Sequence, residues 1–417
     1  MKNELKQVLQ LPVIVAALGY FVDIYDLLLF SIVRVQSLQD LGVSPDHLLE
    51  KGVFLINMQM IGMLIGGVLW GIMGDKKGRL SVLFGSILMY SLANIANGFV
   101  QTELQYAILR LIAGIGLAGE LGAGITLVAE ILPKEVRGYG TSLVAGVGLL
   151  GAVLANIVSE MFDWRMAYMI GGGLGLLLLI MRVSISESGI YSAVKKQKEV
   201  NKGNFFALFA NKQRLMRYVR CILIGLPIWF VIGVLMTFSP EFGVAFGITT
   251  AVSAGKAVMY GYIGLSMGDL ISGVLSQQLK SRKKVVGLFI AFTTMAMLVY
   301  LYYPWSTDGG LYFCCWLAGM SIGYWALFVT IAAEQFGTNL RATVATTVPN
   351  FIRGAVVPIT FLFMQARTVW GIITAALVVG LFTVAIAVWA LYKLEETYHR
   401  QLDFTEADDD QLVPVRD

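Results

Sequence analysis

The sequence contains few charged residues for its length. Only 14% of its 417 residues are Asp, Glu, Lys or Arg, and 57% are apolar; soluble domains average about 25% charged and about 45–50% apolar residues. Polar residues are therefore too scarce to cover the surface of a soluble protein, and a mean hydropathy of +0.74 favours a chain that lies in a lipid bilayer.

Histidine and cysteine are scarce as well. His47 and His399 are the only histidines, and Cys221, Cys314 and Cys315 fall in apolar stretches without spaced histidine partners. These residues predict neither a zinc site nor a disulfide scaffold. The net charge is only +4, with basic residues interleaved with apolar ones, so a nucleic-acid-binding surface is not expected. We expect no metal and no organic cofactor.

Long apolar runs are abundant. A membrane span needs about 20 helical residues, because its backbone polar groups must be satisfied within the helix. The first run is too long for a signal-peptide core and lacks a small-residue cleavage site, so it is predicted to remain as a span. Apolar runs bounded by charges, Pro or Gly predict twelve spans, at about 11–36, 52–73, 80–98, 104–131, 139–161, 164–182, 218–238, 252–277, 285–303, 310–333, 342–365 and 369–391.

The distribution of basic residues predicts the orientation. If the N-terminus is cytoplasmic, 24 of the 31 Lys and Arg residues lie in cytoplasmic segments. The opposite side has only Lys51, Arg165, Lys256 and Arg367, while Arg34, Arg110 and Arg353 fall within spans. The positive-inside rule then places both termini in the cytoplasm.

The longest polar stretch divides the spans into two groups of six. We predict an N-terminal six-helix bundle at 1–183, a cytoplasmic linker at 184–217, a C-terminal six-helix bundle at 218–392 and a cytoplasmic tail at 393–417. An internal repeat supports this division: Gly67-Val68-Leu69 matches Gly273-Val274-Leu275, and Ala129-Glu130 matches Ala333-Glu334, each pair followed by basic residues at similar spacing. The chain is thus predicted to be a duplicated six-helix unit.

Two sets of residues resemble a known family. Gly71-Ile-Met-Gly-Asp75-Lys-Lys-Gly-Arg79 resembles the G-x-x-x-D-[RK]-x-G-[RK] loop of the major facilitator superfamily, and the second half has a degraded copy. Arg110 to Glu120, Ala129-Glu130, Arg137-Gly138 and Asp23-Ile-Tyr-Asp26 resemble its metabolite and proton symporters and related bacterial amino-acid and nucleoside importers. The resemblance implies an all-α membrane transporter whose two bundles rock around a central cavity.

The resemblance also implies a cytoplasmic gate. Asp75 with Lys76 and Arg79 is similar to the family's latch, which holds the bundles together in the outward-open state. Glu130, Arg137, Glu334 and Arg341 would be the matching charges at the inner rim. Interfacial charges that only determine topology would give a similar pattern.

Ionisable residues inside spans are costly, so they are candidates for function. From the helical rise, Asp26 in span one and Arg110 in span four lie at depths that allow them to meet. An analogous acid and arginine pair is known in proton-coupled members of the superfamily, so we predict Asp26 as the proton site and Arg110 as its partner; a permanent structural ion pair is the alternative. Asp23 and Glu120 lie at similar depths, and either could bind a proton or a substrate amine.

The second half supplies the predicted substrate residues. Arg353 lies between Pro349 and Pro358, which weaken the helix, and a guanidinium there suits bidentate capture of a carboxylate. The alternative is a structural partner for a buried acid, for example Asp269. Asn350 is added as a polar neighbour, and aromatic walls would come from Trp229, Tyr260, Tyr324 and Trp325, although packing roles are common for such residues.

Together these features predict a proton-coupled importer in the bacterial inner membrane. Acids in the first half and an arginine in the second suit a zwitterion, so amino acids are the first choice of substrate, followed by organic acids and nucleosides. A proton-driven exporter of drugs or metabolites is the alternative. The linker and tail are too short for a signalling domain, and no nucleophile with a base is visible, so neither a sensor nor an enzyme is expected. We expect a monomer that has protons as its coupling ion and lipid and a small molecule as its partners.

Overall fold

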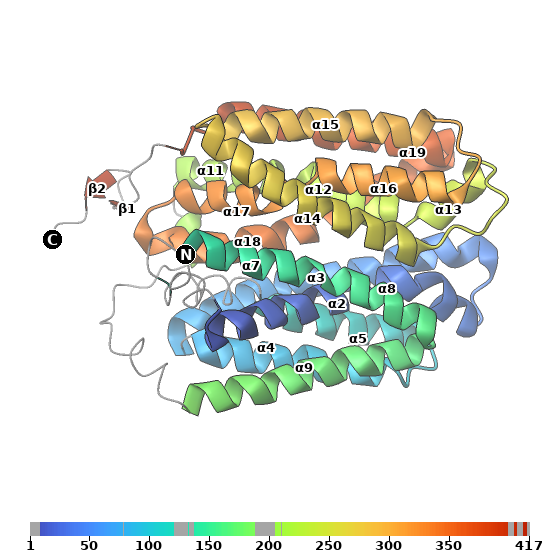
Figure 1. The fold of residues 1–417 in the computed structure, drawn as a ribbon, viewed down its shortest axis with the longest axis horizontal. Helices are drawn as coiled ribbons and strands as arrows, with labels where there is room; N and C mark the ends of the chain where they lie inside the picture. Colours follow the sequence, from blue (N-terminus) through green and yellow to red (C-terminus); the bar gives the residue numbers. More distant parts are fainter. Residues whose placement is uncertain are drawn as a thin grey trace.

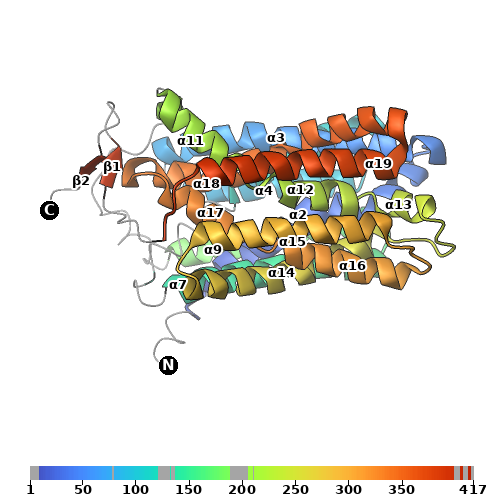
Figure 2. The same cartoon turned by 90° about the horizontal axis from the view of Figure 1, so that it is seen from above.

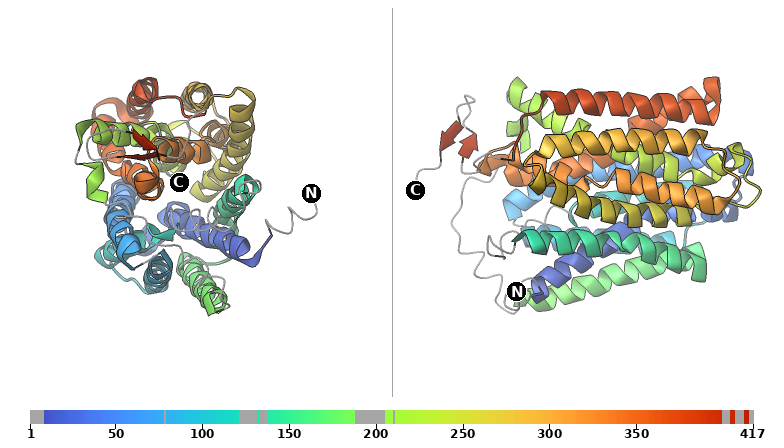
Figure 3. Two further views of the ribbon diagram at one scale, coloured as in Figure 1. Left: turned by 90° about the vertical axis from the view of Figure 1, so that its left-hand side faces the viewer. Right: turned by 45° about the horizontal axis from the view of Figure 1, so that its top comes forward.

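The computed structural model describes residues 9–77, 79–120, 132, 137–187, 205–209, 211–398, 404–406 and 412–414. Its helices run side by side along the long axis of the molecule, with the first half of the chain in one group and the second half in the other (Figure 1). A view along that axis and a side view turned by 45° about it show the same separation (Figure 3). The boundaries predicted for the two bundles, the linker and the tail stay predictions.

The first half is made of apolar helices joined by short turns. Polar side chains begin some of them: Thr102, for example, accepts a hydrogen bond from the backbone N–H of Gln105. Its elements are α2 (Leu11–Asp40), the 3-10 helix η1 (Pro45–His47), α3 (Leu48–Lys77), α4 (Arg79–Asn97), α5 (Glu103–Leu117), α7 (Arg137–Leu149), α8 (Gly151–Met161) and α9 (Trp164–Glu187).

The second half contains more interruptions. Its helical elements are η2 (Phe205–Leu208), α11 (Lys212–Leu223), α12 (Leu226–Phe230), the π-helix η3 (Val231–Met236), α13 (Ser239–Ala245), α14 (Ala254–Gln278), α15 (Arg282–Tyr302), α16 (Asp308–Ser321), α17 (Trp325–Glu334), α18 (Thr338–Gly354) and α19 (Val356–Lys393). In the tail, β1 (Phe404–Glu406) pairs antiparallel with β2 (Leu412–Pro414), a short hairpin that the sequence did not predict.

Nine stretches of the described residues are long and apolar enough to cross a membrane. One of them, Thr343–Lys393, contains two predicted spans, because Gly371 interrupts the helix with a positive φ of 74°. Two more predicted spans, 80–98 and 104–131, correspond to α4 and α5, and residues 121–131 lie outside the described part. The chain is an all-α membrane protein with a small hairpin in its tail, and the count of twelve spans stays a prediction.

Helix ends differ from the predicted boundaries around the linker. Helix α9 continues to Glu187, and α11 already begins at Lys212 because the Asn211 side chain accepts a hydrogen bond from the N–H of Gln213. Residues 188–204 of the predicted linker lie outside the described residues.

The two groups meet along α3 and α18 and where α14 packs against α2 and α8. Several side-chain hydrogen bonds cross between the groups. In two of them, Thr360 donates to Asn57 Oδ1 (2.9 Å), and Asn350 donates to the carbonyl of Ala118 (2.8 Å). Helix α2 begins and α19 ends at the same end of the molecule (Figure 2), as an even number of crossings requires. Which side of the membrane this end faces stays a prediction.

Candidate functional site

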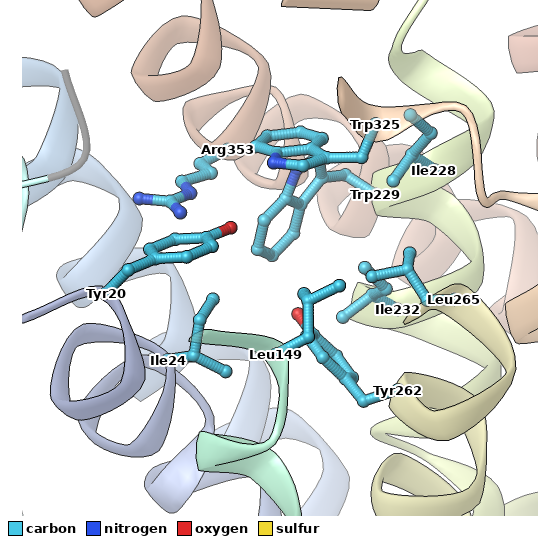
Figure 4. Close-up of a pocket in the computed structure, with 10 residues that line it drawn as sticks. All are labelled: Tyr20, Ile24, Leu149, Ile228, Trp229, Ile232, Tyr262, Leu265, Trp325 and Arg353. Atoms are coloured by element: carbon cyan, nitrogen blue, oxygen red, sulfur yellow. The ribbon is translucent and has the colours of Figure 1, made fainter. Parts of the chain in front are cut away.

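A small cavity lies between the two helix groups and is lined by side chains from both of them (Figure 4). Its volume of about 10 Å³ is room for about one water molecule. The lining residues are Tyr20, Ile24, Leu149, Ile228, Trp229, Ile232, Tyr262, Leu265, Trp325 and Arg353. Apart from Arg353 and the polar tips of the aromatic rings, the wall is apolar.

Interrupted helices place several of these side chains. Leu149 ends α7, Ile232 lies in the π-helical turn η3, and Trp325 is the first residue of α17. The span that contains η3 is also interrupted before Pro227, which lacks a backbone N–H. Broken helices at membrane depth are typical of transporter binding sites, and π-turns often occur at functional sites.

Arg353 is the charged group of this cavity. Its Nη2 lies 3.7 Å from Asp23 Oδ2, and both side chains are almost completely buried. The guanidinium lies 5.8 Å from the centre of the Trp325 ring and 6.0 Å from that of Trp229. Among the described residues, Arg353 Nε and Nη1 and Trp229 Nε1 have no hydrogen-bond partner. The cavity therefore offers buried donors that a carboxylate could satisfy.

The predicted contact between Asp26 and Arg110 is not a direct ion pair. Arg110 donates to Asn94 Oδ1 (2.5 Å), and its guanidinium lies 4.6 Å from the centre of the Tyr168 ring. Both Asp26 carboxyl oxygens are buried without a hydrogen-bond partner among the described residues. Sequence reasoning placed both residues in the same region but did not foresee Asn94 as the partner of Arg110.

Glu120 has a partner that the sequence did not indicate. Arg182 of α9 binds both carboxyl oxygens of Glu120, with Nη1 3.0 Å from Oε2 and Nη2 bonded to Oε1. Arg182 is the last residue of the predicted span 164–182, and its side chain is buried. Asp23 and Glu120 thus have separate counterions, Arg353 for Asp23 and Arg182 for Glu120.

The other predicted substrate residues divide into two groups. Trp229 and Trp325 line the cavity and lie edge to face, 6.4 Å apart. Tyr324 and Asn350 do not: Tyr324 donates to the carbonyl of Ile224 (3.1 Å), and Asn350 bonds across the bundle interface. Tyr260 is 39% exposed and stacks on Tyr312.

Two further cavity residues, Tyr20 and Tyr262, were not predicted from the sequence; their helices place their side chains in the cavity wall.

Those predicted gate residues whose backbone is described lie at the end of the molecule where α19 finishes. Asp75 and Lys76 end α3, while Arg79 and Arg137 begin α4 and α7; the side chains of these four residues lie outside the described part, as does the whole of Glu130. Glu334 lies 3.3 Å from Arg282 Nη2 and accepts a 2.6 Å hydrogen bond from Thr397. Arg341 donates from Nε to the carbonyl of Ala333 (3.3 Å).

At the opposite end, a buried ion pair joins the two groups. Arg34 of α2 contacts Glu241 of α13 with both ends of its guanidinium, at 2.7 Å each, and also donates to the carbonyls of Leu48 and Thr237. Arg34 was recognised only as a charge inside a span, because the sequence does not show which groups face each other across the bundles.

Comparison with known families decides what kind of protein has this site. Residues 16–352 match the Major Facilitator Superfamily. The chain belongs to this superfamily. It is therefore a membrane transporter of metabolites and not an enzyme.

Several bacterial relatives are similar over most of their length. A putative metabolite transport protein of Haemophilus influenzae is 28% identical to this chain. The aligned region covers 81% of this chain and 84% of that protein. The niacin transporter NiaP of Acinetobacter baylyi is 26% identical, over 79% of this chain and 80% of that protein. The gentisate transporter of Corynebacterium glutamicum is also 26% identical, over 77% of this chain and 73% of that protein.

The fold is shared with a solved transporter. The structure of the proton:xylose symporter XylE bound to 6-bromo-6-deoxy-D-glucose superimposes with a TM-score of 0.67, at 17% sequence identity, over 94% of this chain and 97% of that one. At this identity the similarity establishes the major facilitator fold alone.

Proposed function

We propose that this superfamily member imports a small carboxylic acid together with protons across the bacterial inner membrane. The observation that carries the proposal is the buried guanidinium of Arg353 in an aromatic cavity. Its Nε and Nη1 have no hydrogen-bond acceptor among the described residues. A planar guanidinium binds a carboxylate through two parallel hydrogen bonds. Trp229 and Trp325 beside it suit a planar ring next to that carboxylate.

The names of the relatives support the same class. Two of the relatives described above are named for niacin and for gentisate, and both compounds are aromatic carboxylic acids. The sequence alone favoured amino acids, on the basis of midmembrane acids that could bind an amine. Asp23 and Glu120 already have arginine partners, so carboxylic acids now come first.

Protons are the proposed coupling ion, and Asp23 connects them to the substrate. Asp23 is the counterion of Arg353, so a substrate carboxylate that binds Arg353 competes with it. An acid that loses its counterion in a buried site is stabilised by binding a proton. Binding of substrate and of proton would then favour each other. Asp26, whose carboxyl oxygens have no hydrogen-bond partner among the described residues, is proposed as a second proton site.

The test is uptake by proteoliposomes with an imposed pH gradient. We expect labelled niacin or benzoate to accumulate when the inside is alkaline, and a panel of neutral amino acids not to accumulate. Arg353→Lys keeps the charge but loses the planar fork, and we expect it to lower affinity for the acid at least tenfold.

Arg165→Lys is the matched control, because Arg165 binds Asp40 and backbone carbonyls at one end of the molecule, far from the cavity. Accumulation of amino acids but not of carboxylic acids would refute the proposal.

A further inference from the structure

Asp269 of α14 is buried, with a side chain only 9% exposed, and does not line the cavity. Its Oδ1 accepts a 3.1 Å hydrogen bond from the backbone N–H of Ala326, the second residue of α17. The N–H of Trp325 faces the same carboxyl group. Asp269 was considered above as a partner for Arg353, but Arg353 contacts Asp23 instead.

Helix α17 begins inside a predicted span. Residues Asp308–Glu334 form one apolar stretch, which the structure divides into α16 and α17. The first N–H groups of a helix have no partner within that helix, and the residue before α17, Tyr324, makes no side-chain capping bond. A carboxylate from the neighbouring helix therefore satisfies this N-terminus, where a negative charge is also favoured by the helix dipole.

The break is held close to α14. A Cβ atom placed on Gly323 would lie 2.3 Å from the Cα of Gly268, so the two backbones are in direct contact at the residue next to Asp269. This contact brings the Asp269 carboxylate within reach of the first turn of α17.

The first residue of α17 is the cavity residue Trp325, whose ring lies edge to face with Trp229 and beside the Arg353 guanidinium. We propose that Asp269 is a positioning residue for the substrate site: its capping of α17 fixes the backbone of Trp325 and hence the aromatic wall beside Arg353. The substrate part of this inference rests on the proposed function, whereas the capping part does not.

Two substitutions of Asp269 by residues of similar size distinguish its hydrogen bond to α17 from its negative charge and from its packing volume. Asp269→Asn keeps an oxygen acceptor for the N–H of Ala326, whereas Asp269→Leu keeps only the volume. The matched control is Ser272→Ala, because Ser272 is also buried in α14 but donates within that helix, to the backbone carbonyl of Asp269, and so tests the loss of a polar group beside Asp269 that leaves its carboxylate in place.

The first measurement is amide hydrogen exchange of residues 325–328 in the substrate-free, full-length protein. We expect faster exchange in Asp269→Leu and near-normal exchange in Asp269→Asn and Ser272→Ala. Unchanged exchange in Asp269→Leu, or faster exchange that Asp269→Asn does not reverse, would overturn the proposal.

The second measurement is the kinetics of proton-driven uptake of the carboxylic acid. A displaced Trp325 should raise KM about tenfold in Asp269→Leu with less than a twofold change in kcat, and Asp269→Asn should restore KM. An unchanged KM in Asp269→Leu, or an equal rise of KM in Asp269→Leu and Asp269→Asn, contradicts the positioning role. If the unmodified protein transports no carboxylic acid, the proposed function fails while hydrogen exchange still decides the role of Asp269.

Discussion

At the scale of single residues, the most unusual group is Asp26. Its two carboxyl oxygens are completely buried, and no described residue donates a hydrogen bond to either of them. A buried, unpartnered carboxylate is costly, and binding a proton removes that cost. This makes Asp26 suited to exchange protons as the surrounding helices move.

We expect Asp26→Asn to abolish uptake against a concentration gradient and to leave counterflow exchange of substrate measurable, because the amide resembles a permanently protonated acid. The comparison is made in proteoliposomes with and without a pH gradient. Asp46→Asn, a matched change at an exposed residue of η1, should keep concentrative uptake. Full concentrative uptake in Asp26→Asn would rule out a coupling role for this residue.

The sequence predicted which charged residues lie in the membrane but not how they pair. Helical rise gives the position of a residue along its helix, and the structure shows that Asp23, Asp26, Arg110, Glu120 and Arg353 are buried. It does not give the direction in which a side chain points around its helix or the packing of distant helices. The pairs Asp23 with Arg353 and Glu120 with Arg182 depend on both, so they required the structure.

At the scale of helices, the contact between α14 and the break before α17 has no room for a side chain. A Cβ atom on Gly268 would lie 2.2 Å from the carbonyl oxygen of Met320. Gly268→Ala should therefore force the helices apart and destabilise the protein by about 1–3 kcal/mol, measured as a lower midpoint of thermal unfolding in detergent.

Gly273→Ala is the control on the same helix, because a Cβ there meets no atom within 4 Å. We expect it to be neutral or to stabilise by up to about 1 kcal/mol, since alanine favours the helix. Equal midpoints for the two variants would contradict this account of the packing.

The segment after α19 is fixed to the start of α15. Glu396 accepts hydrogen bonds from the hydroxyl of Ser281 and from the N–H groups of Arg282 (2.9 Å) and Lys283 (3.2 Å). Partial burial alone would raise the pKa of Glu396, but these hydrogen bonds outweigh it and lower the pKa. The attachment is therefore complete above the ordinary glutamate pKa of about 4.3 and is lost as the pH falls through the lowered value.

We expect Glu396→Gln to release residues 394–398 at pH 7, seen as severalfold faster hydrogen exchange after correction for the intrinsic rate. The unmodified protein should keep this protection at pH 7 and lose it only as the pH falls below the ordinary glutamate pKa of about 4.3 and through the lowered pKa of Glu396. If the hydrogen-exchange protection of residues 394–398 in Glu396→Gln still changed between pH 7 and pH 3.5, a group other than Glu396 would be responsible for the pH dependence.

The interruptions of helices were only partly predictable. Pro349 and Pro358 suggested a weakened helix, and Gly371 could adopt its positive φ, but the break between α16 and α17 has no proline. It depends on the backbone contact between Gly268 and Gly323, residues that are far apart in the sequence. Local propensity does not contain that information.

At the scale of the whole molecule, the pair of Arg34 and Glu241 joins the two helix groups at the end opposite the termini. Arg34 is completely buried, and removing one partner of a buried ion pair costs about 3–5 kcal/mol. We expect Glu241→Gln to open this end, so that spin labels at the exposed residues Phe162 and Val244 show a larger population of long distances.

The control for that measurement is Arg165→Gln, which removes an ion pair with Asp40 within the first group of helices at the same end. Its distance distribution should match that of the unmodified protein. An unchanged distribution in Glu241→Gln would show that the pair does not hold the groups together.

The small volume of the cavity has a consequence for the kinetics of binding. Room for about one water molecule excludes a ring with a carboxylate, so the state described here cannot take up such a substrate directly. Binding has to wait for an opening step, and the observed association rate will level off at high substrate concentration at the rate of that step. The measured affinity will be weaker than the intrinsic one by the fraction of molecules that are open.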